Sequence, residues 1–177
     1  MSTDDSAPFV VNAPYGIAIV FNGNLTNFAA LREELHTKDL VKLNAHSDIE
    51  AMLHVFAQEL SHRTTGPFIA NVYDTVRAVH KRCKGAYSTI ACIAGKGMIA
   101  FRDPLGIRPL MIGKRGHGKN AEYIVASESV MFTMLDFKYV DDVKPGEAVF
   151  IDTHNTIHRK VITSGKWKPC LFEYVYF

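Results

Sequence analysis

Hydrophobic and polar positions recur along this chain with two different periods, and the changes of period divide it into segments. In residues 24–35, 47–60 and 66–85 the apolar positions return at the spacing of a helix. Before and after these segments the chain shows short runs of β-branched and aromatic residues, which are typical of strands. The pattern therefore predicts a pair of strands, then three helices, then a long series of strands.

The expected strands are separated by glycine- and proline-containing turns. They lie at residues 8–12, 15–21, 86–95, 97–103, 109–115, 122–129, 147–152 and 153–162, with one short helical turn at Val130–Leu135. Helices and strands that are segregated in this way indicate an α+β fold with antiparallel sheets, because a parallel sheet would require them to alternate.

Two of the expected helices carry capping signals. Asn24 or Thr26 can cap the first helix, since either side chain can accept from the free amides of its first turn. In the second helix, Ser47 and Glu50 have the spacing of a capping box.

Length, composition and charge limit the possible classes of protein. The chain has 177 residues, 47% of them apolar, and a formal net charge of +2, which suits one globular domain. Its 20 basic and 18 acidic residues are interspersed, so we expect no nucleic-acid partner. No apolar run reaches the ~20 residues of a membrane span, and the polar start "MSTDDSAPF" is unlike a signal peptide. We expect a cytoplasmic protein without a membrane partner.

The pair Asn22-Gly23 directly follows an apolar run. Asn-Gly usually forms a tight hairpin turn, but here the residues that follow have a helical period and not that of a second strand. A strand that ends at this pair would present two donors, the Asn22 side-chain amide and the Gly23 N–H. Two fixed donors of this kind can form an oxyanion hole, where losing one costs about 3–4 kcal/mol of transition-state stabilisation. The hairpin turn is the structural alternative.

Several longer motifs carry a resemblance to a known family. The chain resembles, from residue 8 to residue 177, the glutaminase domain of the amidophosphoribosyltransferases, which are class II glutamine amidotransferases. The motifs are "NAPYGIAIVFNGNLTNFAALREEL", "HSDIEAML", "GAYSTIACIAGKGMIAFRDPLGIRPLMIGKR", "ASESVMF", "DDVKPGEAVFI" and "LFEYVYF". The last two distinguish this family from other class II amidotransferases, such as glucosamine-phosphate synthase or asparagine synthetase.

The resemblance implies a fold, a reaction and three site residues. The fold is the N-terminal nucleophile hydrolase sandwich, with layers α-β-β-α. Residues 1–171 would form the amidotransferase domain, and residues 172–177 would begin the connection to a phosphoribosyltransferase domain. In the family, an N-terminal cysteine hydrolyses glutamine, and the ammonia attacks phosphoribosylpyrophosphate to give 5-phosphoribosylamine for purine synthesis. Asn22 and Gly23 match the oxyanion donors, and Asp48 matches the carboxylate that binds the α-amino group of glutamine.

Asp48 also has a purely structural interpretation. It stands at the start of a helix, where a negative charge stabilises the helix dipole by about 0.3–1 kcal/mol. Both roles can coexist.

The cysteines do not supply the family's nucleophile. Cys83, Cys92 and Cys170 are interpreted as packing residues, because none can combine a thiolate with its own free amine. The family's nucleophile and its glutamine-binding arginine would precede Met1. We therefore expect a domain truncated at its N-terminus, inactive by itself, with open sheet edges that favour a homo-oligomer. A non-catalytic homologue acting as a binding module is the alternative.

The remaining polar clusters predict no further site. We expect no metal or cofactor in this chain, although the full enzyme of this family needs magnesium and some members carry an iron–sulfur cluster near the position of Cys170. Arg102, Asp103 and Arg108 are expected to order the turn at Pro104–Gly106. The pair His154 and His158 is too far apart for one metal ion.

Overall fold

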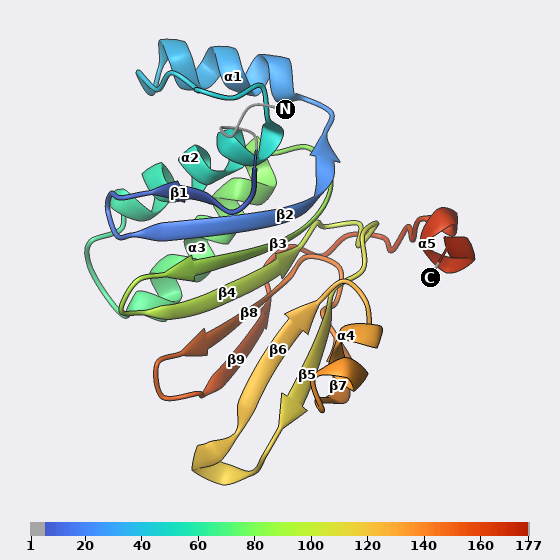
Figure 1. Cartoon of the computed structure of the whole chain (residues 1–177). Coiled ribbons are helices and arrows are strands. Elements are labelled where there is room, and N and C mark those ends of the chain that lie inside the picture. Colours follow the sequence, from blue (N-terminus) through green and yellow to red (C-terminus); the bar gives the residue numbers. More distant parts are fainter. Residues whose placement is uncertain (1–5, 177) are drawn as a thin grey trace.

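The structure, a computed structural model, describes residues 6–176. Residues 1–5, on which the signal-peptide argument partly depends, lie outside this range. Its elements are β1 (Phe9–Val11), β2 (Ile17–Leu25), α1 (Phe28–Thr37), α2 (Asp48–Ser61), α3 (Phe68–Arg82), β3 (Gly85–Ile93), β4 (Gly97–Arg102), β5 (Met111–Arg115), η2 (Gly118–Asn120), β6 (Glu122–Ala126), α4 (Val130–Met134), β7 (Lys138–Asp142), β8 (Glu147–Asp152), β9 (Ile157–Val161) and α5 (Leu171–Tyr176) (Figure 1).

The strands form two antiparallel sheets. The larger sheet has the order β1-β2-β3-β4-β8-β9 and the smaller one the order β6-β5-β7. Helices α2 and α3 cover one face of the larger sheet, and α4 lies beside the smaller sheet (Figure 1). The α+β class and its antiparallel sheets are confirmed.

Two apolar cores separate the layers. The first lies between the larger sheet and α1–α3 and contains Ile99 and Phe101 of β4, together with most of the buried helix residues. Successive strand residues face opposite sides, so Ala100 between them enters the second core, between the two sheets. Beyond the smaller sheet, Phe132 of α4 packs so closely on Gly113 that a Cβ there would lie 3.0 Å from its ring. The layer order is therefore α-β-β-α.

Several element boundaries differ from those expected, and one strand was not expected. Strand β2 continues to Leu25, where a strand end at Phe21 was expected, because β3 is long enough to pair with it throughout. Helix α3 ends at Arg82, and Gly85 is already the first residue of β3. Strand β7 was not predicted at all, because its sequence KYVDD is largely exposed and lacks an apolar alternation.

The predicted cap of α1 is wrong, whereas Ser47 is the N-cap residue of α2 but does not form the predicted capping box. Asn27 immediately precedes α1, and its side chain donates to the Arg82 carbonyl and accepts from the Lys84 N–H, each at 2.8 Å. Ser47 makes no side-chain cap bond at α2. Asn27 therefore bonds to backbone groups at the connection between α3 and β3 and not to the free amides of α1.

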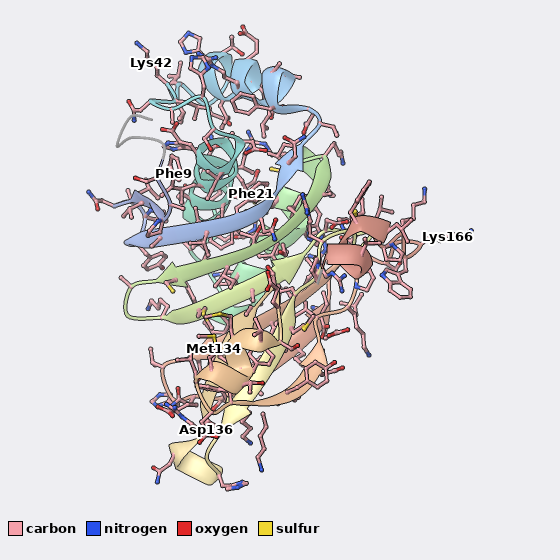
Figure 2. The ribbon with its side chains drawn as sticks, turned by 45° about the vertical axis from the view of Figure 1, so that its right-hand side comes forward. Phe9, Phe21, Lys42, Met134, Asp136 and Lys166 are labelled. Carbon is pink, nitrogen blue, oxygen red and sulfur yellow. The ribbon has the colours of Figure 1, made fainter. Side chains whose placement is uncertain are left out.

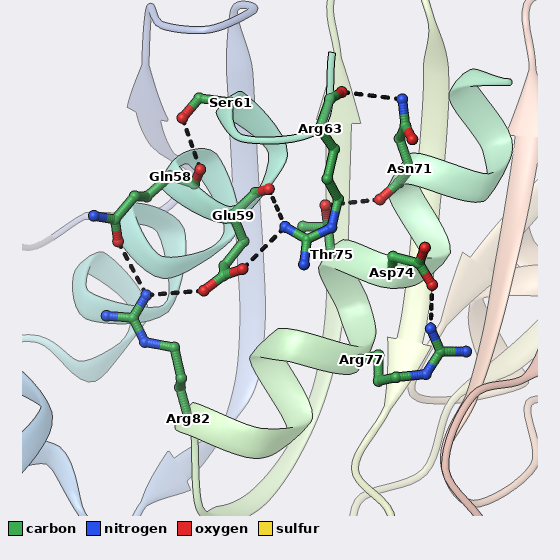
Figure 3. A network of polar contacts seen from close by, with 9 residues as sticks. All are labelled: Gln58, Glu59, Ser61, Arg63, Asn71, Asp74, Thr75, Arg77 and Arg82. Atoms are coloured by element: carbon green, nitrogen blue, oxygen red, sulfur yellow. Dashed lines mark hydrogen bonds and ion pairs between the residues drawn. The ribbon is translucent and has the colours of Figure 1, made fainter. Parts of the chain in front are cut away.

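A network of ion pairs joins the ends of the first three helices. Figure 3 shows its part between α2 and α3. At the end of α3, Arg82 contacts Glu59 and Gln58 of α2 at 3.2 and 3.0 Å, and Glu34 of α1 at 3.1 Å. It also pairs with Asp39. The network fixes the point where α3 passes into β3, the strand that supports Asn22 and Gly23.

The turn after β4 is ordered as predicted. The Arg102 guanidinium donates to the carbonyls of Val143 and Gly106 at 2.8 and 2.9 Å, and to that of Arg108. The buried Asp103 carboxylate accepts from the N–H groups of Leu105 and Ile107 at 2.8 and 3.0 Å. These residues satisfy backbone groups, which supports their structural interpretation.

No helix within residues 6–176 combines the length and apolar character needed to cross a bilayer.

Candidate active site

Asn22 and Gly23 lie inside β2 and not at its tip. Asn22 is opposite Ser88 of β3, Gly23 is opposite Tyr87, and pairing continues to Leu25. The expectation that the strand ends at this pair is therefore wrong. The hairpin alternative is excluded as well, because the strands beside β2 are β1 and β3.

The backbone of Gly23 cannot carry a side chain. A Cβ at this position would lie 2.1 Å from the Ala86 carbonyl oxygen and 2.7 Å from the Tyr87 Cα, well inside van der Waals contact. Glycine lets the two backbones approach closely at this point.

The N–H of Gly23 points away from β3. In an antiparallel pair, residues that exchange hydrogen bonds alternate with residues that do not. The bond from the Thr26 N–H to the Lys84 carbonyl, 2.8 Å, shows that the even-numbered residues of β2 are the bonded ones. The Gly23 N–H therefore faces the opposite edge of β2, and β1 covers that edge only along Ile17–Ile19.

The Asn22 side chain supplies the second donor. It is exposed on the face of β2 opposite the helices, and its Nδ2 lies 3.4 Å from Oγ of Ser127, which follows β6 in the smaller sheet. The amide has two N–H bonds, so one remains available when the other is directed to Ser127. An oxygen at the corner formed by this face and the free edge could accept hydrogen bonds from both the Asn22 amide and the Gly23 N–H.

Asp48 lies at the same edge. Its Oδ2 accepts from the Leu25 N–H at 2.8 Å. Because Leu25 and Gly23 are two residues apart, their N–H groups point in the same direction, roughly 7 Å from each other. The structure thus brings together all three residues that the sequence indicated.

The segment before Asp48 is held by Glu50, a role that the sequence analysis missed. The buried Glu50 carboxylate accepts from the N–H groups of Asn44 and Ala45 at 2.9 and 2.7 Å. The Ser47–Glu50 spacing was the available signal, but it suggested a local cap. The contact of Ser127 was also missed, although its motif "ASES" had been noted.

The three cysteines differ in burial and in their position relative to Asn22 and Gly23. Cys83 is buried at the end of α3, where burial raises the pKa of its thiol to about 12. Cys92 is on β3, four residues and therefore about 13 Å from Ser88, the residue opposite Asn22. Cys92 is exposed, so its interpretation as a packing residue is wrong, whereas Cys170 is half-buried.

The described residues show no cluster suited to a metal ion. Within residues 6–176 no three His, Cys, Asp or Glu side chains are grouped for this purpose. Asp152 accepts from the His154 N–H at 2.8 Å and contacts Nε2 of His158 at 3.0 Å. These contacts order the turn between β8 and β9.

A family model described as a glutamine amidotransferase domain matches residues 1–134. The chain belongs to this family. Residues 1–134 include Asn22, Gly23 and Asp48, so all three candidate residues lie within the matched part of this amidotransferase domain.

Similar curated proteins are named amidophosphoribosyltransferase. Those of Escherichia coli and Pseudomonas aeruginosa are 45% and 42% identical to this amidotransferase domain, over 99% of the chain. The chain covers 35% of each of these proteins, about a third of their length. The resemblance found in the sequence motifs is thereby confirmed.

A solved structure shows the same fold. The glutamine phosphoribosylpyrophosphate amidotransferase of B. subtilis, in complex with ADP and GMP, matches with a TM-score of 0.80 and 25% identity. The match covers 98% of this amidotransferase domain and 36% of the other chain. This confirms the fold expected for an N-terminal nucleophile hydrolase.

Proposed function

We propose that this amidotransferase domain binds glutamine in an amidophosphoribosyltransferase. In that enzyme, glutamine and water give glutamate and ammonia, and the ammonia displaces pyrophosphate from phosphoribosylpyrophosphate to give 5-phosphoribosylamine. The observation that carries the proposal is that the Asp48 carboxylate lies at the same edge of β2 as the Gly23 N–H. The relatives over nearly the whole chain favour this enzyme over other class II amidotransferases and over a non-catalytic module.

The three residues would act at the two ends of one glutamine molecule. As the amide carbon becomes tetrahedral, its oxygen gains negative charge, and Asn22 Nδ2 and the Gly23 N–H donate to it. At the other end, Asp48 accepts from the α-ammonium group through Oδ1, while Oδ2 stays bonded to Leu25. Cys83 is buried with a raised thiol pKa, and Cys92 lies about 13 Å from the residue opposite Asn22. Neither suits the attacking thiolate, which we assign to the N-terminal cysteine that the resemblance implies.

The proposal extends to cofactors, partners and location. The amidotransferase reaction needs no metal or cofactor from this chain, and magnesium would serve the phosphoribosyl transfer in the full enzyme. Cys170 alone cannot hold an iron–sulfur cluster. The enzyme would be a cytoplasmic homo-oligomer, without nucleic-acid or membrane partners. That residues 172–177 begin the connection to the transferase domain also stays a proposal.

The test supplies the chain with a nucleophile. We would fuse it behind an N-terminal segment with the cysteine that the resemblance implies, and measure glutamate release from glutamine. Asn22→Ala should lower kcat roughly 100- to 1,000-fold with little change in KM, because its donor acts on the transition state. Asp48→Asn should mainly raise KM, since it weakens binding of the α-ammonium group.

Asn24→Ala is the matched control, because Asn24 is an exposed amide two residues further along the same face of β2. It should retain most of the activity. Equal losses in Asn22→Ala and Asn24→Ala would contradict the oxyanion role. Glutamate release by the unfused chain would show that a group other than the expected cysteine is the nucleophile.

A further inference from the structure

A cavity of about 500 Å³ lies between α1 and the segment that follows it. The Val41 N–H donates to the Leu35 carbonyl at 2.9 Å, which turns residues 41–43 back alongside the helix. Figure 2 shows Lys42 on this segment, beside α1 at the outer end of the molecule. The volume is within the range of pockets that bind small molecules.

The floor of the cavity is apolar. Leu43 is buried, and Phe28 and Val41 are half-buried with part of their surface facing the cavity. Phe28 and Arg32 are one helical turn apart, so the ring and the guanidinium lie on the same side of α1. A flat apolar group could therefore cover the floor while its polar end stays at the rim.

The charged groups at the rim are mainly basic. Arg32 and Lys42 are exposed there, with Glu33 as the acidic lining residue and His36, counted here as neutral, as the fourth polar one. Glu34, the next residue of α1, pairs with Arg82 at 3.1 Å on another side of the helix. The rim therefore carries one net positive charge. A guanidinium with a planar fork of donors suits a carboxylate or phosphate.

We propose that this cavity binds a small organic anion, in which a flat apolar ring carries a phosphate or carboxylate. The ring lies on Phe28, Val41 and Leu43, and the anionic group contacts Arg32 and Lys42. Arg32 then leaves its present contact, in which Nη1 lies 3.2 Å from Nδ1 of His46. The site is lined by α1 and residues 41–43 and does not include Asn22, Gly23 or Asp48, so it is independent of the proposed glutamine site.

The test is a ligand titration of the whole 177-residue chain at low ionic strength. NMR of the backbone amides monitors the binding. The probes are phenyl phosphate, benzoate, inorganic phosphate and phenol. Phenyl phosphate should cause saturable shifts confined to residues 28–46, and should bind at least tenfold more tightly than phosphate or phenol alone. Comparison with benzoate identifies which anionic group is preferred.

Substitutions at two exposed positions on the rim should have opposite effects on the affinity for phenyl phosphate. Arg32→Ala should weaken the binding of phenyl phosphate at least fivefold. Glu33→Gln should tighten its binding about twofold, because it removes a repulsive charge. Lys138→Ala, an exposed lysine on β7, is the control and should change nothing. Because all three side chains are exposed, the variants should fold, and the dispersion of their amide spectra verifies this.

Shifts scattered over the surface, phenol binding as tightly as phenyl phosphate, or equal affinity in Arg32→Ala would each overturn the proposal. Because none of these readouts involves glutamine, the outcome is separate from that of the glutaminase test.

Discussion

At the scale of single residues, the close approach of β2 and β3 at Gly23 defines the candidate oxyanion site. Backbone atoms of Ala86 and Tyr87 occupy the space where a side chain would begin. The same contact that requires glycine also holds its N–H in one direction. The stability of the β2–β3 pair and the position of the Gly23 N–H therefore both depend on the absence of a side chain at this residue.

Gly23→Ala should lower the free energy of unfolding by about 1–3 kcal/mol, because β3 has to move away from the added methyl group. Urea denaturation followed by circular dichroism measures this. Gly16→Ala is the matched control, since its Cβ would meet only the Ala94 side chain, at 3.3 Å. Equal effects of the two substitutions would contradict the steric argument.

His80 is a buried histidine in the first core. Its ring packs against Tyr87 and Phe101, with centroids 6.2 and 6.1 Å apart, and its Nδ1 lies 3.1 Å from Oγ1 of Thr163. Burial lowers the pKa of this imidazole from 6.5 to about 4. In the folded protein His80 is therefore neutral at pH values at which it is already charged in the unfolded chain.

This difference in the pKa of His80 between the folded and the unfolded chain predicts that the free energy of unfolding falls in acid. The stabilising contribution is complete above pH 6.5 and is lost as the pH falls toward 4, and its full size is about 3 kcal/mol. In His80→Phe the free energy of unfolding should fall less between pH 7 and pH 4.5 than in the unmodified protein. Urea denaturation at both pH values measures this. His117→Gln, at an exposed position, should keep the original slope, and an unchanged slope in His80→Phe would show that other groups are responsible.

At the scale of elements, the start of α2 depends on a contact with the segment before it. Glu50 accepts two backbone N–H groups from residues 44 and 45, and so orders the approach to Asp48. A buried acceptor that serves two donors stabilises more than an exposed cap, because its loss leaves both donors without a partner.

Glu50→Gln should therefore lower the free energy of unfolding by about 1–3 kcal/mol, since an amide donor would face one of the two N–H groups. Hydrogen exchange should accelerate at Asn44 and Ala45, as measured by NMR. Glu33→Gln, an exposed position on α1, should alter neither quantity. Unchanged exchange at residues 44 and 45 would contradict this role for Glu50.

At the scale of the whole molecule, the outer helical layer is thin. Helix α4 is short, and large apolar side chains remain exposed on it and on nearby β7 (Figure 2 labels Met134). This apolar patch consists of Val130, Met131, Met134, Leu135, Tyr139 and Val140, between 42% and 73% exposed. Exposed apolar side chains that gather on neighbouring elements can mark an interface.

We expect the chain to self-associate through this patch. Met134→Glu should shift the population toward monomer, because a charge at Met134, the most exposed of these side chains, opposes their burial. Light scattering during size-exclusion chromatography over a concentration series measures this. Leu40→Glu is the control, since Leu40 is 86% exposed and lies in a different part of the chain. A monomer at every concentration would contradict the expectation of a homo-oligomer.

The sequence by itself determined most of the secondary structure and pointed to Asn22, Gly23 and Asp48. Periodicity identified α1–α3 and most strands because their residues face a core on one side only, so burial leaves a local pattern. Strand β7 escaped because most of its side chains are exposed, and the capping hydrogen bonds were misassigned because Asn27 and Glu50 bond to backbone groups outside the expected cap positions.

Only the tertiary structure decided how the site is assembled. No local pattern shows that β3 extends the pairing of β2 to Leu25, that Gly23 directs its N–H away from β3, or that Asp48 reaches the same edge. The cavity beside α1 and the contact between Asn22 and Ser127 likewise form only when the chain has folded. Spacing along the chain reports which side of an element is buried, whereas hydrogen bonds between distant segments depend on how the layers pack.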